Sequence, residues 1–247
     1  MNICGTEVDQ SSIVRGGGYF INADCVAGMK SFPDKFFDLA IVDPPYFTGP
    51  ERRQYYGRKV SPIGVKRTYN PSLNHWSVPG KEYFDELFRV SKEQIIWGIN
   101  YFDYPTGPGR IVWDKCNGNS SFSDCEIAFC SLHDSVRLFR YMWNGMMQGK
   151  SIESGWIMQG NKQLNEKRIH PTQKPVALYE WILNKYAKPG DSILDTHAGS
   201  ASSLIACHRT RHGYVGFEIE RPYYDLAKKR LEDEKAQYTI FDYMDDK

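Results

Sequence analysis

Short runs of β-forming residues alternate with amphipathic stretches along most of this chain, and this alternation constrains the fold most. Strands that alternate with helices build a parallel sheet covered by those helices. We therefore expect an α/β fold with a mostly parallel, twisted sheet and helices on both faces. The expected strands are 18–22, 37–42, 94–97, 110–113, 126–130, 136–141, 192–194 and 214–217, and the expected helices are 81–90, 175–186, 200–209 and 222–234.

Length and composition suit one domain that spans residues 1–247, with 41% hydrophobic and 25% charged residues. No apolar run is long enough to cross a bilayer and the first ten residues lack a signal sequence, so we expect a cytoplasmic protein without a membrane partner. The six cysteines lack CxxC spacing, which predicts reduced thiols and no metal site. The net charge is only +1, so nucleic-acid binding would require a local basic patch.

Two long stretches, residues 47–75 and 144–170, do not fit the pattern of strands and helices. A compact domain rarely keeps such long loops unless they act as lids or binding loops. The first stretch carries a single acid, Glu51, and three tyrosines, Tyr55, Tyr56 and Tyr69. This composition fits either a solvated loop or a nucleic-acid clamp. The basic residues that would contact DNA are Arg52, Arg53, Arg58, Lys59, Lys66 and Arg67.

The tetrapeptide Asp43-Pro44-Pro45-Tyr46 follows the apolar run 39–42. It therefore falls at the carboxyl end of an expected parallel strand, where open α/β sheets bind their ligands. Two successive prolines fix the backbone and leave carbonyl oxygens without competing N–H groups. An Asp-Pro turn after a strand is also common, so the four residues alone do not decide the function.

These residue types suit the methylation of an amino group on a nucleic-acid base. Such an amine is a poor nucleophile because its lone pair is delocalised into the ring. If Asp43 and the Pro44 carbonyl each accept one amine hydrogen, the nitrogen rehybridises and its lone pair becomes available. Tyr46 can stack on the base and hold it in line with the methyl donor.

The surrounding motifs strengthen this interpretation. The tetrapeptide is similar to the catalytic DPPY motif of amino-methyltransferases that act on DNA. Residues 170–175, His-Pro-Thr-Gln-Lys-Pro, match a signature of the permuted (beta-type) group, in which the catalytic motif precedes the cofactor motif. Residues 192–202 resemble that family's S-adenosylmethionine loop, and residues 213–218 end a further strand in an acid. The resemblance covers about Tyr19 to Leu231 and implies a Rossmann-like S-adenosylmethionine-dependent methyltransferase fold with circularly permuted motif order.

The resemblance also implies roles for individual residues. The catalytic set is Asp43, Pro44, Pro45 and Tyr46. Glu218 would accept the ribose hydroxyls of the cofactor, Asp24 its adenine amine, and Lys174 its methionine carboxylate. Asp24 could instead cap a helix, and Lys174 could be an exposed charge at a helix start. The full cofactor-binding set is Asp24, Cys25, Asp43, Lys174, Asp195, His197, Ala198, Gly199, Ser200, Ser202 and Glu218.

The cofactor loop departs from the family pattern at three positions. The family usually carries Asp-Pro-Phe and a second glycine, where this chain has Thr196, His197 and Ala201. Alanine can replace that glycine if its φ stays negative, so we expect cofactor binding to be retained. His197 is expected to cover the cofactor in place of phenylalanine, and a proton-carrying role is the alternative.

Four residues at strand ends are expected, by the same resemblance, to border the base pocket: Asn100, Trp113, Asp114 and Lys115.

The resulting hypothesis is a site-specific methyltransferase that modifies adenine N6 of a base flipped out of duplex DNA, as in restriction-modification systems. The partners are double-stranded DNA, S-adenosylmethionine and, by resemblance, a second copy of the chain in a homodimer. Cytosine N4 is the first alternative, although that group more often has serine at the position of Asp43. Methylases of protein glutamine are a further alternative, but their related motif begins with asparagine, which argues against them here. A catalytically silent DNA-binding subunit is the alternative from another class.

Overall fold

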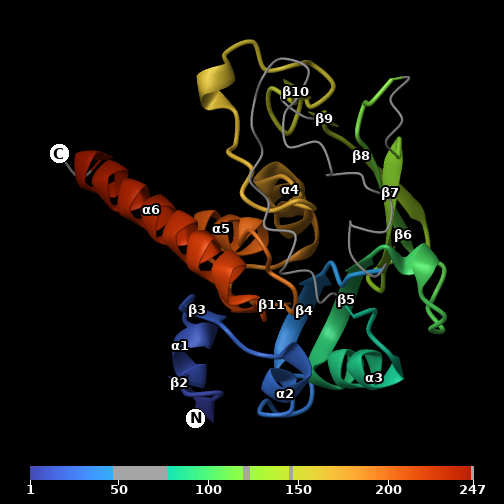
Figure 1. Ribbon diagram of the computed structural model, residues 1–247, viewed down its shortest axis with the longest axis vertical. Coiled ribbons are helices and arrows are strands. Elements are labelled where there is room, and N and C mark those ends of the chain that lie inside the picture. The colour runs from blue at the N-terminus through green and yellow to red at the C-terminus, as the bar shows by residue number, and fades with distance from the viewer. Residues whose placement is uncertain (47–76, 119–122, 145–146, 246–247) are drawn as a thin grey trace.

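The computed structural model describes residues 1–46, 77–118, 123–144 and 147–245, with side chains up to residue 237. Eight strands form the main sheet, and all but one run in the same direction (Figure 1). The exception is β7, which is antiparallel to both of its neighbours. In spatial order the strands are β3 (Gly18–Ile21), β12 (Gly213–Phe217), β11 (Ser192–Asp195), β4 (Phe37–Val42), β5 (Ser91–Trp97), β7 (Cys125–Cys130), β6 (Arg110–Asp114) and β8 (Val136–Arg140).

The helices expected from the sequence are also present. They are α3 (Lys81–Val90), α4 (Val176–Tyr186), α5 (Ser202–Arg209) and α6 (Arg221–Asp245). Pro175 precedes α4 as its cap instead of beginning it, and α6 continues beyond the expected end at residue 234. Two five-residue helices were not predicted: α1 (Gln10–Val14) and α2 (Cys25–Met29). The expected α/β class, with a mostly parallel sheet and helices on both faces, is confirmed.

Alternate side chains of the central strands enter two separate cores. Leu39 and Ile41 of β4 pack in the core that includes α4, α5 and α6, whereas Ala40 and Val42 pack in the core that includes α1, α2 and α3. Figure 1 shows the two groups of helices on opposite sides of the sheet. Burial on both faces explains why these strands appear in the sequence as continuous apolar runs.

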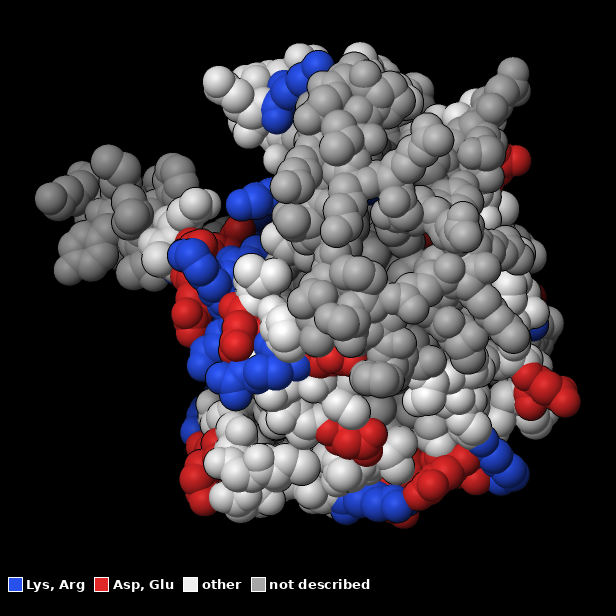
Figure 2. Space-filling model, in the orientation of Figure 1, with Lys and Arg blue, Asp and Glu red and all other residues white. Residues whose placement is uncertain are grey.

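The stretch 144–170 is less irregular than expected. It contains part of a small hairpin, β9 (Trp143–Asn144) with β10 (Met147–Gln148), and the short helix η4 (Lys162–Leu164). A second small hairpin joins β1 (Asn2–Ile3) to β2 (Thr6–Glu7), and η3 (Ile99–Tyr101) follows β5. No helix within the described ranges is long and apolar enough to cross a membrane. On the face shown in Figure 2, basic and acidic side chains are interspersed.

Candidate active site

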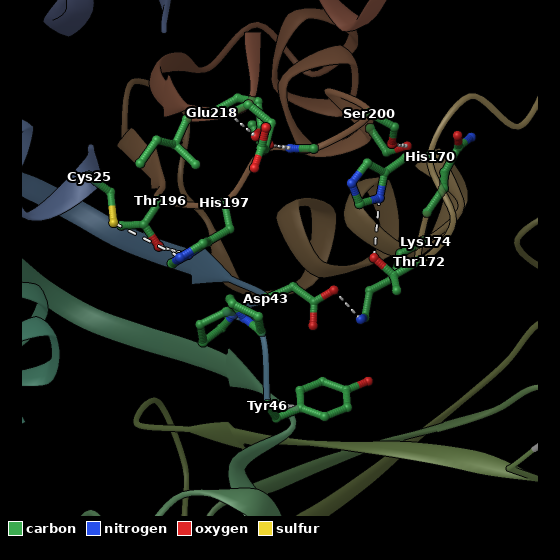
Figure 3. Close-up of a pocket in the computed structure, with 18 of the residues that line it drawn as sticks. Cys25, Asp43, Tyr46, His170, Thr172, Lys174, Thr196, His197, Ser200 and Glu218 are labelled. Atoms are coloured by element: carbon green, nitrogen blue, oxygen red, sulfur yellow. Dashed lines mark hydrogen bonds and ion pairs between the residues drawn. The ribbon is translucent and has the colours of Figure 1, made fainter. Parts of the chain in front are cut away.

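The loops that follow β3, β4, β11 and β12 meet at one edge of the sheet and line a pocket (Figure 3). The chain leaves β4 toward β5 on one side, whereas β11 leads to β12 on the other. The pocket therefore lies at the point where the strand order reverses, the usual ligand site of an open α/β sheet. The lining residues that were predicted to be catalytic or to bind the cofactor are Asp24, Cys25, Asp43, Pro44, Pro45, Tyr46, Lys174, His197, Ala198, Gly199, Ser200, Ser202 and Glu218.

Asp43 is held by Lys174, whose side chain is only 3% exposed. The ammonium of Lys174 donates to Asp43 Oδ2 (Figure 3) and lies 2.9 Å from Glu126 Oε2. It also lies 5.6 Å from the ring centre of Trp97. Lys174 is therefore not the exposed charge that was its alternative interpretation, and two carboxylates already neutralise it.

Glu126 was not identified from the sequence, yet it belongs to this site. Its other oxygen pairs with Lys115, so that two carboxylates and two lysines form a continuous, partly buried row of ion pairs. Because β7 runs against the other strands, its first residues lie at the same edge as the last residues of β6, where Trp113 pairs with Glu126. A sequence shows an acid near the start of an apolar strand, but not the direction of that strand.

The ionisation states of Asp43, Lys174, Glu126 and Lys115 depend on each other. Burial opposes ionisation of Glu126, but Lys174 and Lys115 outweigh it and lower its pKa to about 2. Burial raises the pKa of Asp43, and Lys174 partly offsets that effect. The pKa of Lys174 lies well above its usual value because the attraction of Asp43 and Glu126 exceeds the cost of burying the ammonium.

The second oxygen of Asp43 has a different environment. Oδ1 is buried and has no hydrogen-bond partner in the part of the chain that the structure describes. A buried acceptor without a partner costs about 1–3 kcal/mol, which a donor entering the pocket would recover. Asp43 thus offers one anchored oxygen and one available acceptor.

The ring of Tyr46 lies below this carboxylate in Figure 3. Tyr101 of η3 stacks on it, with ring centres 4.5 Å apart and an angle of 4° between the planes. Gly98 approaches the same ring so closely that a Cβ atom there would lie 2.4 Å from Cδ1 of Tyr46. The orientation of Tyr46 is therefore set by the turn after β5.

The loop after β11 turns sharply beneath the pocket. Asp195 itself does not line the pocket; it accepts from the His197 backbone N–H at 2.9 Å and from the Ser203 hydroxyl. Gly199 has φ +51° and Ala201 has φ +60°. Ala201 therefore does not meet the condition of a negative φ under which alanine was expected to replace the glycine. A left-handed alanine costs about 1–2 kcal/mol, which the surrounding loop must offset.

Glu218 and Asp24 close the other side of the pocket. Glu218 accepts from the backbone N–H groups of Gly199 at 3.0 Å and Glu220 at 2.8 Å, and burial raises its pKa to about 7. Asp24 caps α2 by accepting from the Ala27 N–H at 2.8 Å. It also lines the pocket, so the capping role and a ligand role are compatible.

His197 is buried, and burial lowers the pKa of its imidazole to about 4. Its ring meets Tyr83 edge-on, with ring centres 5.4 Å apart, and its Nδ1 lies 2.9 Å from the Thr196 hydroxyl. A neutral, tightly packed imidazole supports the expected covering role over the proton-carrying alternative.

The remaining predicted residues are divided. Trp113 is 1% exposed and donates to the Tyr141 carbonyl, so it packs in the core. Asp114 pairs with Arg140, and Asn100 is exposed, whereas Lys115 joins the charge chain. The predicted DNA contacts Arg52, Arg53, Arg58, Lys59, Lys66 and Arg67 lie outside the described residues.

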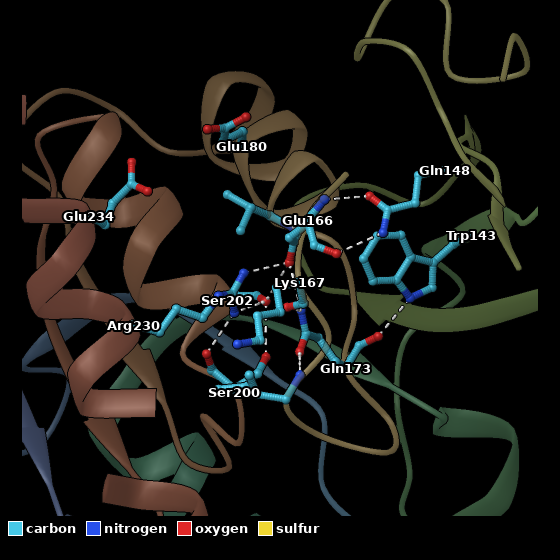
Figure 4. Close-up of polar contacts among 12 residues, drawn as sticks. Trp143, Gln148, Glu166, Lys167, Gln173, Glu180, Ser200, Ser202, Arg230 and Glu234 are labelled. Atoms are coloured by element: carbon cyan, nitrogen blue, oxygen red, sulfur yellow. Dashed lines mark hydrogen bonds and ion pairs between the residues drawn. The ribbon is translucent and has the colours of Figure 1, made fainter. Parts of the chain in front are cut away.

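A second polar cluster lies behind the cofactor loop and centres on Glu166 (Figure 4). Its carboxylate accepts from Arg230 at 2.5 Å, from Gln173 at 2.8 Å and from the backbone N–H of Val176 at 3.0 Å. Arg230 also donates to the Ser200 carbonyl at 2.7 Å. Glu166 therefore joins the stretch 144–170 to the cofactor loop and to the start of α4.

The charge of the pocket fits the cofactor implied by the sequence. S-adenosylmethionine carries a sulfonium and an ammonium against one carboxylate, so it is a net cation. Lys174 is the one lysine or arginine among the described lining residues, and it is already paired. The acids that line the pocket are Asp24, Asp43, Glu218 and Glu220. An acidic pocket suits a cation that also offers ribose hydroxyl and amine donors.

Comparison with known proteins points in the same direction. A family model described as "DNA methylase" matches residues 133–229. The putative methylase YubD of Escherichia coli is 25% identical, over 86% of this chain and 89% of its own length. The type II methyltransferases M.HinfI of Haemophilus influenzae and M.HpaI of Haemophilus parainfluenzae are 25% and 26% identical, over 87% and 92% of this chain and 68% and 77% of theirs.

Two solved structures share the fold. A putative DNA modification methylase from Thermus thermophilus superposes with a TM-score of 0.51 at 18% identity, covering 88% of this chain and 95% of its own. The cytosine-N4-specific PvuII DNA methyltransferase superposes with a TM-score of 0.53 at 14% identity, covering 88% and 91%. Together with the motif order and the pocket, these matches make the chain similar to the N6/N4 family of DNA methylases.

Proposed function

We propose that this DNA methyltransferase transfers a methyl group to N6 of an adenine flipped out of duplex DNA. The observation that carries the proposal is the Asp43 carboxylate beside Tyr46: Oδ2 is anchored by Lys174, and Oδ1 is buried with no hydrogen-bond partner among the residues that the structure describes. An amino group is the donor that such an acceptor lacks, and an aromatic ring is the platform that a base needs.

The methyl donor is S-adenosylmethionine, which supplies an activated methyl group on its sulfonium. Glu218 would hold the ribose hydroxyls, Asp24 the adenine amine, and the 195–202 loop would place its backbone against the cofactor. The methionine carboxylate would find Lys174 already paired with two acids, Asp43 and Glu126.

The protein's own contribution is alignment and electrostatic stabilisation. Asp43 Oδ1 and the Pro44 carbonyl accept the two amine hydrogens, and Tyr46 fixes the plane of the base. As the nitrogen gains positive charge, the carboxylate stabilises it without reorganisation, because Lys174 already holds Oδ2. His197, neutral and packed against Tyr83, covers the cofactor side.

Adenine is favoured over cytosine for two reasons. A carboxylate accepts more strongly than the serine usual in cytosine-N4 enzymes, and an A·T pair costs less to open than a G·C pair. Cytosine N4 presents nearly the same geometry to Asp43, so it remains the second candidate.

Nucleoside mass spectrometry of unmethylated duplex DNA after incubation with the protein and S-adenosylmethionine tests the proposal. We expect N6-methyladenine from the parent and no methylated base from D43A, with cofactor affinity in the variant within a few-fold of the parent. N4-methylcytosine alone would overturn the choice of base. Methyl transfer by D43A at the parental rate would overturn the mechanism.

A further inference from the structure

We infer that Glu126 is a positioning residue for the transfer reaction: it holds the Lys174 ammonium so that Lys174 anchors one oxygen of Asp43 and leaves the other free. This inference rests on the proposed function of Asp43. It adds a residue that lies on β7, outside every motif recognised in the sequence.

The geometry places Glu126 between two lysines. Its Oε2 lies 2.9 Å from Lys174 Nζ, and its Oε1 pairs with Lys115. All four side chains in this cluster are largely shielded from solvent. Their exposed fractions are 3% for Lys174, 15% for Lys115, 16% for Asp43 and 19% for Glu126. Lys174 therefore has two carboxylates to bridge, and its position is a compromise between them.

Charge balance explains why this cluster of ion pairs contains four side chains. Asp43 and Glu126 contribute two negative charges, and Lys174 and Lys115 contribute two positive charges. Without Glu126 the cluster has an excess positive charge, and Lys174 has Asp43 as its remaining partner in the chain. The ammonium can then approach both Asp43 oxygens and compete with the target amine for Oδ1.

Stability alone is a weak reason to bury these groups. Desolvation largely cancels the attraction within a buried ion pair, and an apolar replacement of similar size is often as stable. A row of paired charges that ends on a carboxylate lining the pocket is better explained by the state in which it keeps that carboxylate.

A double-mutant cycle tests the inference. The variants are E126Q, K115M and the double variant K115M/E126Q, in which Asp43 and Lys174 form a neutral pair again. Lys92→Met is the matched control. Lys92, at the start of β5, forms a 2.6 Å ion pair with Asp38 at the start of β4, far from the pocket edge of the sheet, and its side chain is 54% exposed. Methyl transfer is measured in a single turnover at saturating DNA and cofactor, and cofactor affinity is measured by calorimetry.

We expect E126Q to slow transfer at least about tenfold while its cofactor affinity stays within about twofold of the parent. The double variant should be faster than E126Q, because contacting charges are coupled and do not act additively. Lys92→Met should transfer at the parental rate. Parental transfer by E126Q, or rate losses that multiply in the double variant, would overturn the inference.

The unfolding midpoints of the same variants provide a readout that needs no substrate. We expect the midpoint shifts of the two single changes to be non-additive in the double variant. Additive shifts would overturn the charge chain itself, even if E126Q failed to fold well enough for assay. A parent protein that methylates no DNA would instead overturn the proposed function, and the midpoints would still decide whether Glu126 and Lys115 are coupled.

Discussion

At the scale of single residues, Glu218 gives cofactor binding a pH dependence. Burial raises the pKa of its carboxyl group to about 7 in the free protein. Below this pH the group is protonated and accepts hydrogen bonds from ribose hydroxyls poorly; above it, the carboxylate accepts both. We therefore expect S-adenosylmethionine affinity to rise by up to about tenfold from pH 6 to pH 8, as measured by calorimetry.

Asp195 is the other group that could titrate in this range, because burial also raises its pKa to about 7. It lies behind the loop, however, and binds the His197 N–H and the Ser203 hydroxyl instead of facing the pocket. E218Q should bind the cofactor weakly and with no slope over this range. A parental slope in E218Q would assign the titration to Asp195.

At the scale of elements, η3 supports the base platform through Tyr101. A stacked aromatic pair contributes about 0.5–1.5 kcal/mol beyond the area it buries. We expect Y101A to raise the KM for DNA by about two- to twelvefold, because the Tyr46 ring loses its backing, while Y101F remains close to the parent. Cofactor affinity should not change, since Tyr101 does not line the pocket. A large loss of cofactor affinity in Y101A would contradict this role.

The basic stretch 47–75 remains a predicted phosphate clamp. Replacing Arg52, Arg53 and Arg58 with alanine should weaken DNA binding and flatten the dependence of log K on log salt by up to about three units. Fluorescence anisotropy over a salt series measures this slope. An unchanged slope would show that these arginines do not contact phosphates.

The elements themselves were largely predictable, because buried strands such as β4 appear as apolar runs and end at the motif that follows. The direction of β7 was not, since the apolar pattern of a strand is the same whichever way it runs. For that reason Asp43 was found from its motif and Glu126 was not. The sequence also could not show that Ala201 adopts a left-handed conformation, because the backbone there is imposed by its neighbours in the loop.

At the scale of the whole molecule, the family resemblance predicts a homodimer in which the partner copy extends the contact with DNA. Sedimentation velocity at micromolar concentration should therefore show a dimer. A single species at the monomer mass, both with and without cofactor, would contradict this prediction.

Hydrogen bonds between Gln148 and Glu166 join the two ends of the segment 149–165, so this segment could be exchanged as a unit. The Gln148 amide donates to the Glu166 carbonyl and accepts from its N–H, both at 2.8 Å, so the two ends of the excursion are tied to each other. The Glu166 carboxylate points the other way, toward Arg230 and Gln173. If residues 149–165 act as the binding loop predicted from the sequence, a hybrid enzyme built to read a different DNA sequence could take them from a relative. It would have to keep Gln148 and Glu166, because a graft that crossed either of them would disturb the cofactor loop along with the specificity.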